Sequence, residues 1–195
     1  MDRTSLTLLD RLRDEGDDSA WRELADLYLP VLRNWLRRYD LQSSDADDLI
    51  QEVMLVVSRE VGSFEHSGRT GAFRTWLKST LINRLRDWWR SKKYRPLASG
   101  ESDFLQQLNQ LEDPNSQLSQ LWNAEHDRLL IRQLLATVEP QFSESTRESF
   151  RRIVLCGDDL DQVAKDLGLS RNAVVIAKHR VLKALRHAGE GLIGE

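Results

Sequence analysis

Helical periodicity is the feature of this sequence that most limits its fold. Apolar residues recur at steps of three and four, which places them on one face of an α-helix. The first such stretch has this spacing at Trp21, Leu24, Tyr28, Val31 and Trp35. Alternating runs of β-branched residues and Asn-Gly or Asp-Gly turns, the signs of strands and hairpins, do not occur. The sequence therefore predicts an all-α fold, with a kink or break at Pro30 because proline cannot donate a helical hydrogen bond.

Two more helical stretches follow, separated by a loop. Residues 45–61 carry a face of Leu, Ile and Val, and Ser44 with Asp47 fits a capping box at its start. Residues 62–71 are rich in Gly and Ser, which predicts a loop. From 72 to about 93 an apolar stripe resumes with Phe73, Trp76, Leu77, Leu81, Leu85 and Trp88.

The sequence changes character after residue 95. Pro96, Gly100 and Pro114 punctuate a stretch rich in Gln, Ser and Asn. One short helix fits inside it, with Phe104, Leu105, Leu108 and Leu111 as its apolar residues. Helical periodicity resumes near Glu125. We therefore expect two small helical domains, 1–95 and 125–195, joined by a polar linker over 96–124.

Composition excludes several classes of protein. No apolar run in the 195 residues approaches the ~20 residues of a membrane span, and the start lacks the apolar run of a signal peptide. We therefore expect a cytoplasmic protein without membrane insertion. The single cysteine excludes an internal disulfide and a Cys-rich zinc site, and Cys156 is expected to be a small buried side chain. No nucleotide-binding, hydrolase or metalloprotease motif occurs, so we expect no catalytic residues, no metal and no cofactor.

Charge is segregated along the chain although the net charge is only −3. Residues 1–60 have a net charge of −6, residues 73–95 of +7 and residues 96–125 of −5. Residues 171–187 carry five Lys or Arg and no acid. Two separated basic stretches in an acidic chain fit two contacts with a polyanion, and equally fit two solvated helix faces.

The last basic stretch belongs to a helix-turn-helix pattern over 160–179. Ala164 is the small residue where the helices cross, and Gly168 stands at the turn, where a residue without Cβ easily takes a left-handed conformation. Asp159 with Gln162 fits a capping box for the first helix, and Ser170 is the predicted N-cap of the second. The alternative is an ordinary helical hairpin in a core, which has no need of a second helix with five basic residues and no acid.

Such a second helix fits the major groove of DNA. Ser170 begins it, and its first turns present Arg171, Asn172 and Val175 as candidates for base edges. The residues predicted to contact phosphates are Lys178, Arg180, Lys183 and Arg186.

The earlier basic stretch interleaves aromatic and basic residues. Aromatic rings can stack on unpaired bases and so help to hold DNA strands apart. Trp76 and Trp88 lie on the apolar stripe, which predicts core positions, whereas Trp89 lies off it and is a candidate for nucleic-acid contact. The alternative is a helix whose Trp residues are core and whose Arg residues are solvated.

The helix before the loop carries an acidic side. Asp45, Asp48, Gln51 and Glu52 lie opposite its apolar stripe. This side is either a solvated face or a surface that docks onto a basic protein. A metal site is not expected there, because no Glu-x-x-His pair and no EF-hand pattern occur.

These stretches resemble those of a known family. DADDLIQEVMLVV (45–57) is similar to region 2.2 of bacterial RNA polymerase sigma factors. Residues 72–93 resemble region 2.3 and its continuation, and residues 134–187 resemble region 4. Nothing between them resembles the large region 3 of housekeeping sigma factors. The chain therefore looks like a sigma factor of the extracytoplasmic-function (ECF) type, a promoter-specificity subunit of RNA polymerase.

The resemblance implies a set of partners and contacts. Core RNA polymerase would be bound through its β′ clamp helices by Asp45, Asp48, Gln51 and Glu52, and through its β flap by the region 4-like domain. The loop at 62–71 and the start of the next helix would capture a flipped base of the minus-ten element of promoter DNA. The residues expected to contact this element are Phe64, Arg74, Trp76, Asn83, Arg84, Trp89 and Arg90. The minus-thirty-five element would be bound by Ser170, Arg171, Asn172, Val175, Lys178, Arg180 and Lys183.

Two further points stay open from the sequence. The alternative function is a conventional helix-turn-helix transcriptional regulator with a helical sensor domain, which binds duplex DNA tightly without polymerase. An anti-sigma factor is a candidate partner, since many members of the family are held inactive by a protein that clamps both domains.

Overall fold

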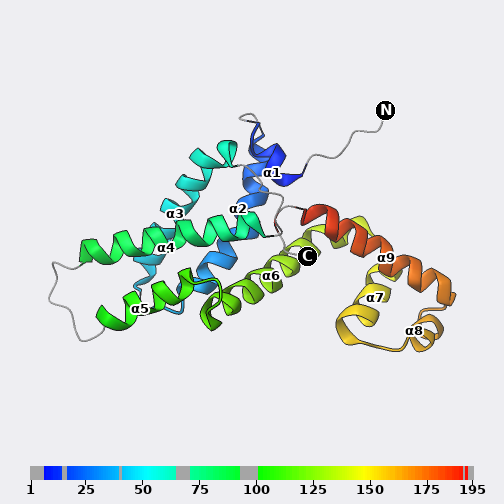
Figure 1. Cartoon of the computed structure of the whole chain (residues 1–195). Helices are drawn as coiled ribbons and strands as arrows, with labels where there is room; N and C mark the ends of the chain where they lie inside the picture. The colour runs from blue at the N-terminus through cyan, green and yellow to red at the C-terminus, as the bar shows by residue number, and fades with distance from the viewer. Residues whose placement is uncertain are drawn as a thin grey trace. The chain divides into compact units, whose positions relative to one another are not determined.

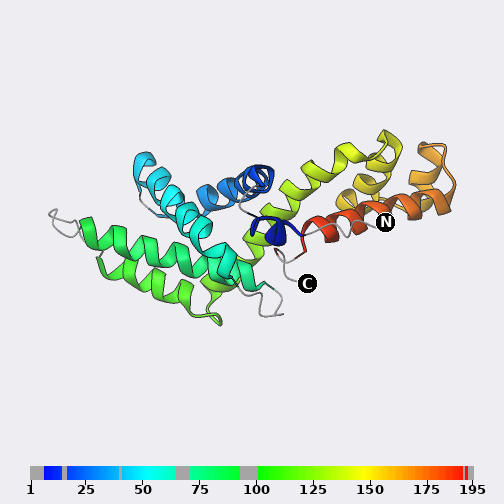
Figure 2. The ribbon, with the colours of Figure 1, turned by 90° about the horizontal axis from the view of Figure 1, so that it is seen from above.

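The computed structural model describes residues 7–14, 17–39, 41–64, 71–92, 101–190 and 192 of the chain. This described part is helical and contains no strand, which confirms the all-α prediction (Figures 1 and 2). It divides into two compact units: unit 1 comprises residues 1–130 with 191–195, and unit 2 comprises residues 131–190. The helices are α1 (Leu8–Arg11), α2 (Asp18–Leu36), α3 (Ser43–Glu60), η1 (Val61–Ser63), α4 (Ala72–Lys92), α5 (Glu101–Glu112), α6 (Gln117–Val138), η2 (Glu139–Gln141), α7 (Glu144–Phe150), η3 (Arg151–Cys156), α8 (Leu160–Asp166) and α9 (Arg171–Ala188).

The first long helix of unit 1 has no break at its proline, although a break was one of the two outcomes expected there. Asp17 begins α2 by accepting a hydrogen bond from the backbone N–H of Ala20 at 2.9 Å. The helix then continues through Pro30 to Leu36 without a break. Tyr28, two residues before the proline, and Val31, the residue after it, are almost completely buried, and this packing outweighs the hydrogen bond that the proline lacks.

The next two helices largely follow their sequence patterns. The predicted apolar face of α3 is buried, with Val53 and Val57 at 1% exposure or less. Its start differs slightly, because α3 begins at Ser43 with Gln42 at the N-cap and with no side-chain capping bond. The long helix α4 ends within one residue of the expected position. Its buried residues cover two adjoining sides of the helix, Leu77 and Leu81 on one and Lys78 and Ile82 about 100° farther round.

The second buried side of α4 explains why the expected polar linker is mostly helix. Helix α5 packs along α4, and Figures 1 and 2 both show the two helices side by side. Leu108 and Leu111 of α5 have no exposed surface. Helix α6 begins at Gln117 rather than near Glu125, after a turn that contains Pro114. Helix α5 contains the apolar residues of the one short helix expected inside the linker, and the earlier start of α6 is the part that was not expected. Residues 96–100 of the expected 96–124 linker lie outside the described residues.

The first half of α6 completes the core of unit 1. The Trp122 ring meets Trp35 of α2 edge-on, with ring centroids 4.8 Å apart, and Trp122 is 1% exposed. Farther along α6, the buried His126 ring lies 5.6 Å from the ring of Tyr28. Unit 1 is thus a bundle whose later helices come from outside the expected 1–95 domain.

Unit 2 contains the predicted helix-turn-helix. Asp159 caps α8 by accepting hydrogen bonds from the N–H groups of Asp161 and Gln162, and Ser170 caps α9 through the N–H of Ala173. Gly168 takes the left-handed conformation at the turn, with φ of +64°. The side chain of Gln162 bonds Asp166 instead of closing a capping box. Val163, Ala164 and Val174 form the centre of the small core.

Cys156 differs from expectation because it is exposed. It ends the π-helical segment η3, just before Gly157 in a left-handed conformation. Val154 and Leu155 of the same segment are also exposed, so the end of η3 turns its side chains outward rather than into the core.

Candidate nucleic-acid and protein interfaces

The acidic side of α3 forms an exposed surface with one apolar residue in it. Asp48, Gln51 and Glu52 are exposed, and Asp45 is half-buried in the first turn. Leu55 lies one turn beyond Gln51 and Glu52 on the same side and is 53% exposed. We call Asp48, Gln51, Glu52 and Leu55 the α3 outer face. Leu55 was not among the residues predicted from the sequence. Its polar neighbours one turn away could have indicated that it is exposed.

Three aromatic rings meet where α4 begins. The Phe64 ring lies 5.7 Å from the ring of Phe73 and 5.2 Å from that of Trp76, and Phe73 and Trp76 are 5.5 Å apart. Phe73 is buried, whereas Phe64 and Trp76 are half-buried. The structure therefore brings the two predicted aromatic contacts together as one partly exposed cluster. Residues 65–70 of the expected base-capturing loop lie outside the described residues.

Arg74, also predicted to contact DNA, is engaged inside unit 1. Its guanidinium forms an ion pair with Asp127 of α6, and its side chain is 14% exposed. The backbone of Gly71 lies against it, since a Cβ at Gly71 would stand 2.6 Å from Nη2 of Arg74. Arg74 and Asp127 are 53 positions apart, so the local sequence pattern could not predict that they pair.

Two more polar groups are buried between α4 and α6. Lys78 is 5% exposed and donates a hydrogen bond to Oγ of Ser119 at 2.5 Å. Burial lowers the pKa of its ammonium, and the nearby positive charge of Arg74 lowers it further. His126 is 1% exposed, and its Nδ1 lies 3.0 Å from Oδ1 of Asp127. Because the ionised carboxylate can only accept, Nδ1 carries the proton of the neutral ring.

The pKa of the His126 ring predicts a loss of stability in mild acid. Burial lowers this pKa below its ordinary value of 6.5, and the hydrogen bond to Asp127 offsets part of that effect. The unfolded chain therefore takes up the proton at a higher pH than the folded chain does. The neutral His126 ring contributes its whole share of the free energy of unfolding above pH 6.5, and this share is lost as the pH falls through the lower folded pKa. His126→Gln should flatten this fall, which has a limiting slope of about 1.4 kcal/mol per pH unit.

Urea unfolding followed by tryptophan fluorescence measures this effect in unit 1, because all 6 tryptophans lie within residues 1–130. The matched control is His179→Gln, an exposed histidine of unit 2. An unchanged pH slope in His126→Gln would contradict the assignment of the proton uptake to His126.

The remaining predicted residues of α4 differ in how far other side chains already engage them. Asn83 and Arg90 are exposed, and Arg84 and Arg90 both reach Asp87, at 2.9 and 3.4 Å. The Trp89 indole stacks on Phe104 of α5, with centroids 4.4 Å apart and planes 18° from parallel. One face of Trp89 is therefore occupied within the protein.

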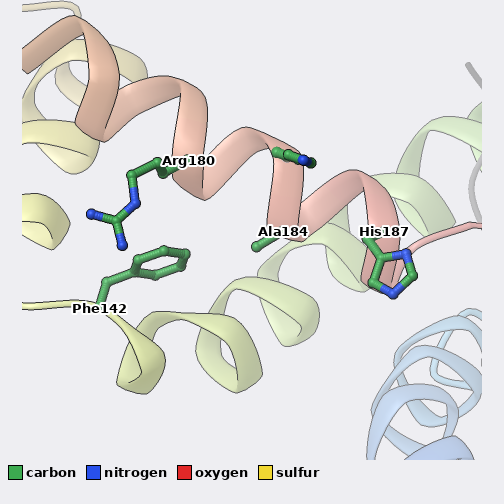
Figure 3. A pocket seen from close by; sticks show the side chains of 5 residues that line it. Phe142, Arg180, Ala184 and His187 are labelled. Atoms are coloured by element: carbon green, nitrogen blue, oxygen red, sulfur yellow. The ribbon is translucent and has the colours of Figure 1, made fainter. Parts of the chain in front are cut away.

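Helix α9 presents most of its predicted residues on one side. Arg171 and Asn172 are exposed, and Val175 and Lys178 are half-buried one and two turns later. Arg180 is nine residues from Arg171, which places it on the opposite side of the helix. There Arg180 and Lys183 line a shallow hollow of about 310 Å³ with Ala184, His187 and Phe142. Figure 3 shows the Arg180 guanidinium next to the Phe142 ring, 5.8 Å from its centroid.

In the part of the chain that the structure describes, no helix is long and apolar enough to span a bilayer. Within the same residues, no group of three or more His, Cys, Asp or Glu side chains is arranged to hold a metal ion.

Comparison with known proteins relates this arrangement to one family. Residues 24–95 match the family model of sigma-70 region 2. The ECF RNA polymerase sigma factor SigF of Caulobacter vibrioides is 29% identical over 174 residues, which cover 88% of this chain and 86% of that protein. The ECF RNA polymerase sigma factor SigL of Mycobacterium tuberculosis is 29% identical over 171 residues, with 88% and 89% covered. The matched lengths exceed either unit alone.

Proposed function

Because this chain belongs to the ECF sigma factors of bacterial RNA polymerase, we propose that it binds core RNA polymerase and directs initiation at specific promoters. The observation that carries the proposal is the match of 24–95 to region 2 on the same chain as a capped, basic helix-turn-helix. The polymerase supplies the chemistry and this chain supplies recognition, so it acts in the cytoplasm on the nucleoid with no catalytic group or cofactor of its own.

The α3 outer face, with Asp45 beside it, is the proposed contact with the β′ clamp helices. Exposed carboxylates set register and association rate when they meet a basic surface. Leu55 adds an apolar contact that keeps its strength in salt. Burial of the opposite side of α3 fixes the direction in which these residues point.

The cluster of Phe64 and Trp76 is the proposed capture point for a base of the minus-ten element. Its two half-buried rings offer stacking surface next to the start of α4. Asn83 and Arg90 supply exposed polar contacts farther along the same helix, with Arg84 beside them. Trp89 has one ring face stacked on Phe104, so it contributes only through its remaining surface, and Arg74 is engaged by Asp127.

Helix α9 is the proposed reader of the minus-thirty-five element. Arg171 and Asn172 lie at its N-terminal end, where side chains reach base edges in the major groove. Ser170 and Lys178 are proposed to contact the phosphate backbone. Arg180 and Lys183 line the hollow beside Phe142 on another side of α9, so the expectation that they contact this element is not part of the proposal. The β flap is the proposed polymerase contact of unit 2.

Promoter-directed transcription tests the proposal as a whole. Purified core RNA polymerase is mixed with this chain and a library of promoter fragments, and the transcript start sites are mapped. We expect new specific starts that need both proteins. A conventional regulator with a helix-turn-helix would instead bind duplex DNA tightly without polymerase and would leave the start sites of core enzyme unchanged. An anti-sigma partner would reduce these starts when it is added.

Substitutions in α9 should separate base contacts from phosphate contacts. Arg171→Ala should weaken holoenzyme binding to the preferred minus-thirty-five sequence by about 1–3 kcal/mol and relax its preference at one base. Lys178→Ala should weaken binding to all sequences and reduce the slope of log affinity against log salt by about 1. Fluorescence anisotropy with labelled promoter duplexes at several salt concentrations measures both.

Arg132→Ala is the matched control, since Arg132 is exposed on the α6 part of unit 2. It removes the same charge away from α9 and should change neither quantity. Equal effects of Arg171→Ala on matched and scrambled sequences would contradict base contact by Arg171.

A further inference from the structure

We infer that Asp127 is a positioning residue for the minus-ten site, acting through Arg74 on Gly71 and the start of α4. This inference rests on the proposed function and deepens it. Asp127 lies outside the 24–95 match to region 2, on a helix that the sequence pattern assigned to another domain. The contact also changes the expected role of Arg74, from a direct ligand of DNA to a support of Gly71 and the start of α4, where Phe73 and Trp76 lie.

The Arg74 guanidinium is held from two sides. Its Nη1 donates to Oδ2 of Asp127, and its other edge lies against Gly71, where an added Cβ would stand 2.6 Å from Nη2 and 3.0 Å from Cζ. Gly71 has φ of +74° and accepts hydrogen bonds through its carbonyl from N–H and Oγ1 of Thr75. The guanidinium thus supports the residue at which segment 65–70 ends and α4 begins.

Asp127 of α6 is itself held by two partners. Its Oδ1 accepts from Nδ1 of His126 at 3.0 Å while Oδ2 accepts from Arg74. The His126 ring is buried against the rings of Tyr28 and Trp122, so the carboxylate has little freedom to move. A carboxylate held in this way gives a strong, directional anchor to a guanidinium.

Phe64, the third member of the aromatic cluster, has a separate anchor. Nη2 of Arg13 donates to the backbone carbonyl of Phe64 at 2.8 Å, and the Phe64 ring packs on Phe73 and Trp76. Phe73 and Arg74 are neighbours at the start of α4, so a shift of Arg74 also moves the cluster on which the base is proposed to stack. Arg74 has 14% of its side chain exposed and one edge under Gly71, which leaves little surface for a nucleotide.

The test compares Asp127→Asn with Glu125→Gln in the full chain. Glu125 is the matched control because it also lies on α6 and pairs with an arginine, Arg38 of α2, away from Gly71. In reconstituted holoenzyme, Asp127→Asn should weaken binding of a single-stranded minus-ten oligonucleotide about tenfold, the loss typical of a charge-assisted hydrogen bond. Core affinity should stay within about twofold, and Glu125→Gln should change neither value.

A double-mutant cycle with Gly71→Ala tests the route of the effect. Asp127→Asn and Gly71→Ala should combine less than additively on oligonucleotide affinity, because both disturb the same guanidinium. Equal losses in Asp127→Asn and Glu125→Gln, or full additivity with Gly71→Ala, would overturn the inference.

Amide hydrogen exchange separates failure of this inference from failure of the proposed function. If the wild-type holoenzyme does not bind the oligonucleotide at all, the proposed function fails. The exchange rate of the Thr75 amide, which is bonded to Gly71, then still reports the support. This rate should rise in Asp127→Asn and not in Glu125→Gln. An unchanged rate in Asp127→Asn would refute the positioning role whatever the protein binds.

Discussion

A fragment that ends at residue 95 is expected to lose the cooperative unfolding of unit 1, whereas a fragment that ends at residue 130 keeps it. The longer fragment retains Leu108, Leu111, Trp122 and Leu130, each at 1% exposure or less. Burial of each such side chain contributes about 1.5–3 kcal/mol. Their combined loss approaches the whole net stability of a small domain, which is roughly 5–15 kcal/mol.

Urea denaturation followed by circular dichroism compares the two fragments. Residues 1–130 should unfold in one sigmoidal transition, and residues 1–95 should lose helix gradually without one. In the full chain, Trp122→Ala should cost about 3–5 kcal/mol, while Leu121→Ala, which is 42% exposed, is the matched control and should cost less than about 1 kcal/mol. Equal urea midpoints for the two fragments would show that α5 and α6 are not part of this fold.

The parts of the fold that depend on local sequence were predictable. The bounds of α4 and the whole helix-turn-helix follow from spacing and caps that lie within a few residues of each other. Ser170 and Asp159 cap the helices that they were expected to cap, and Gly168 turns the chain between them. In these places the side chain and its hydrogen-bond partner are neighbours in the sequence, so one pattern carries the whole interaction.

The packing of α5 and the first half of α6 within unit 1 was not predictable in the same way. Residues 101–124 have no basic residue and many Gln, Ser and Asn, which favours a solvated segment when each residue is judged alone. Their few apolar residues become decisive only because α4 offers a second buried side, with Lys78 and Ile82 on it. That side is invisible to a search for one apolar stripe per helix.

The candidate sites show the same division. Exposure of Asp48, Glu52 and Arg171 follows from helical periodicity, and the structure agrees. The pairing of Arg74 with Asp127 and the stacking of Trp89 on Phe104 join residues that are far apart in sequence. A sequence motif therefore predicts which side chains are candidates for binding, and the tertiary structure shows which of them already contact other residues of the protein.

Reversal of charge on the α3 outer face is expected to abolish stable binding to core RNA polymerase. Asp48→Arg with Glu52→Arg replaces two exposed carboxylates by two cations and leaves the buried side of α3 unchanged. Placing like charges against a basic partner costs several kcal/mol, so affinity should fall by at least about 100-fold at low salt. Fluorescence anisotropy of the labelled chain titrated with core enzyme measures the loss, and circular dichroism checks that the helices remain.

Salt distinguishes the charged contact from the apolar one on the same face. The defect of the double reversal should shrink as ionic strength rises, because screening weakens the repulsion, whereas the smaller defect of Leu55→Ser should persist. Asp18→Arg with Asp26→Arg is the matched control, since both acids are exposed on α2. This control should bind core enzyme within about twofold of wild type. If the reversal on α3 and the control on α2 lower affinity equally, net charge rather than the α3 outer face attracts the polymerase, and the proposed contact with the clamp helices fails.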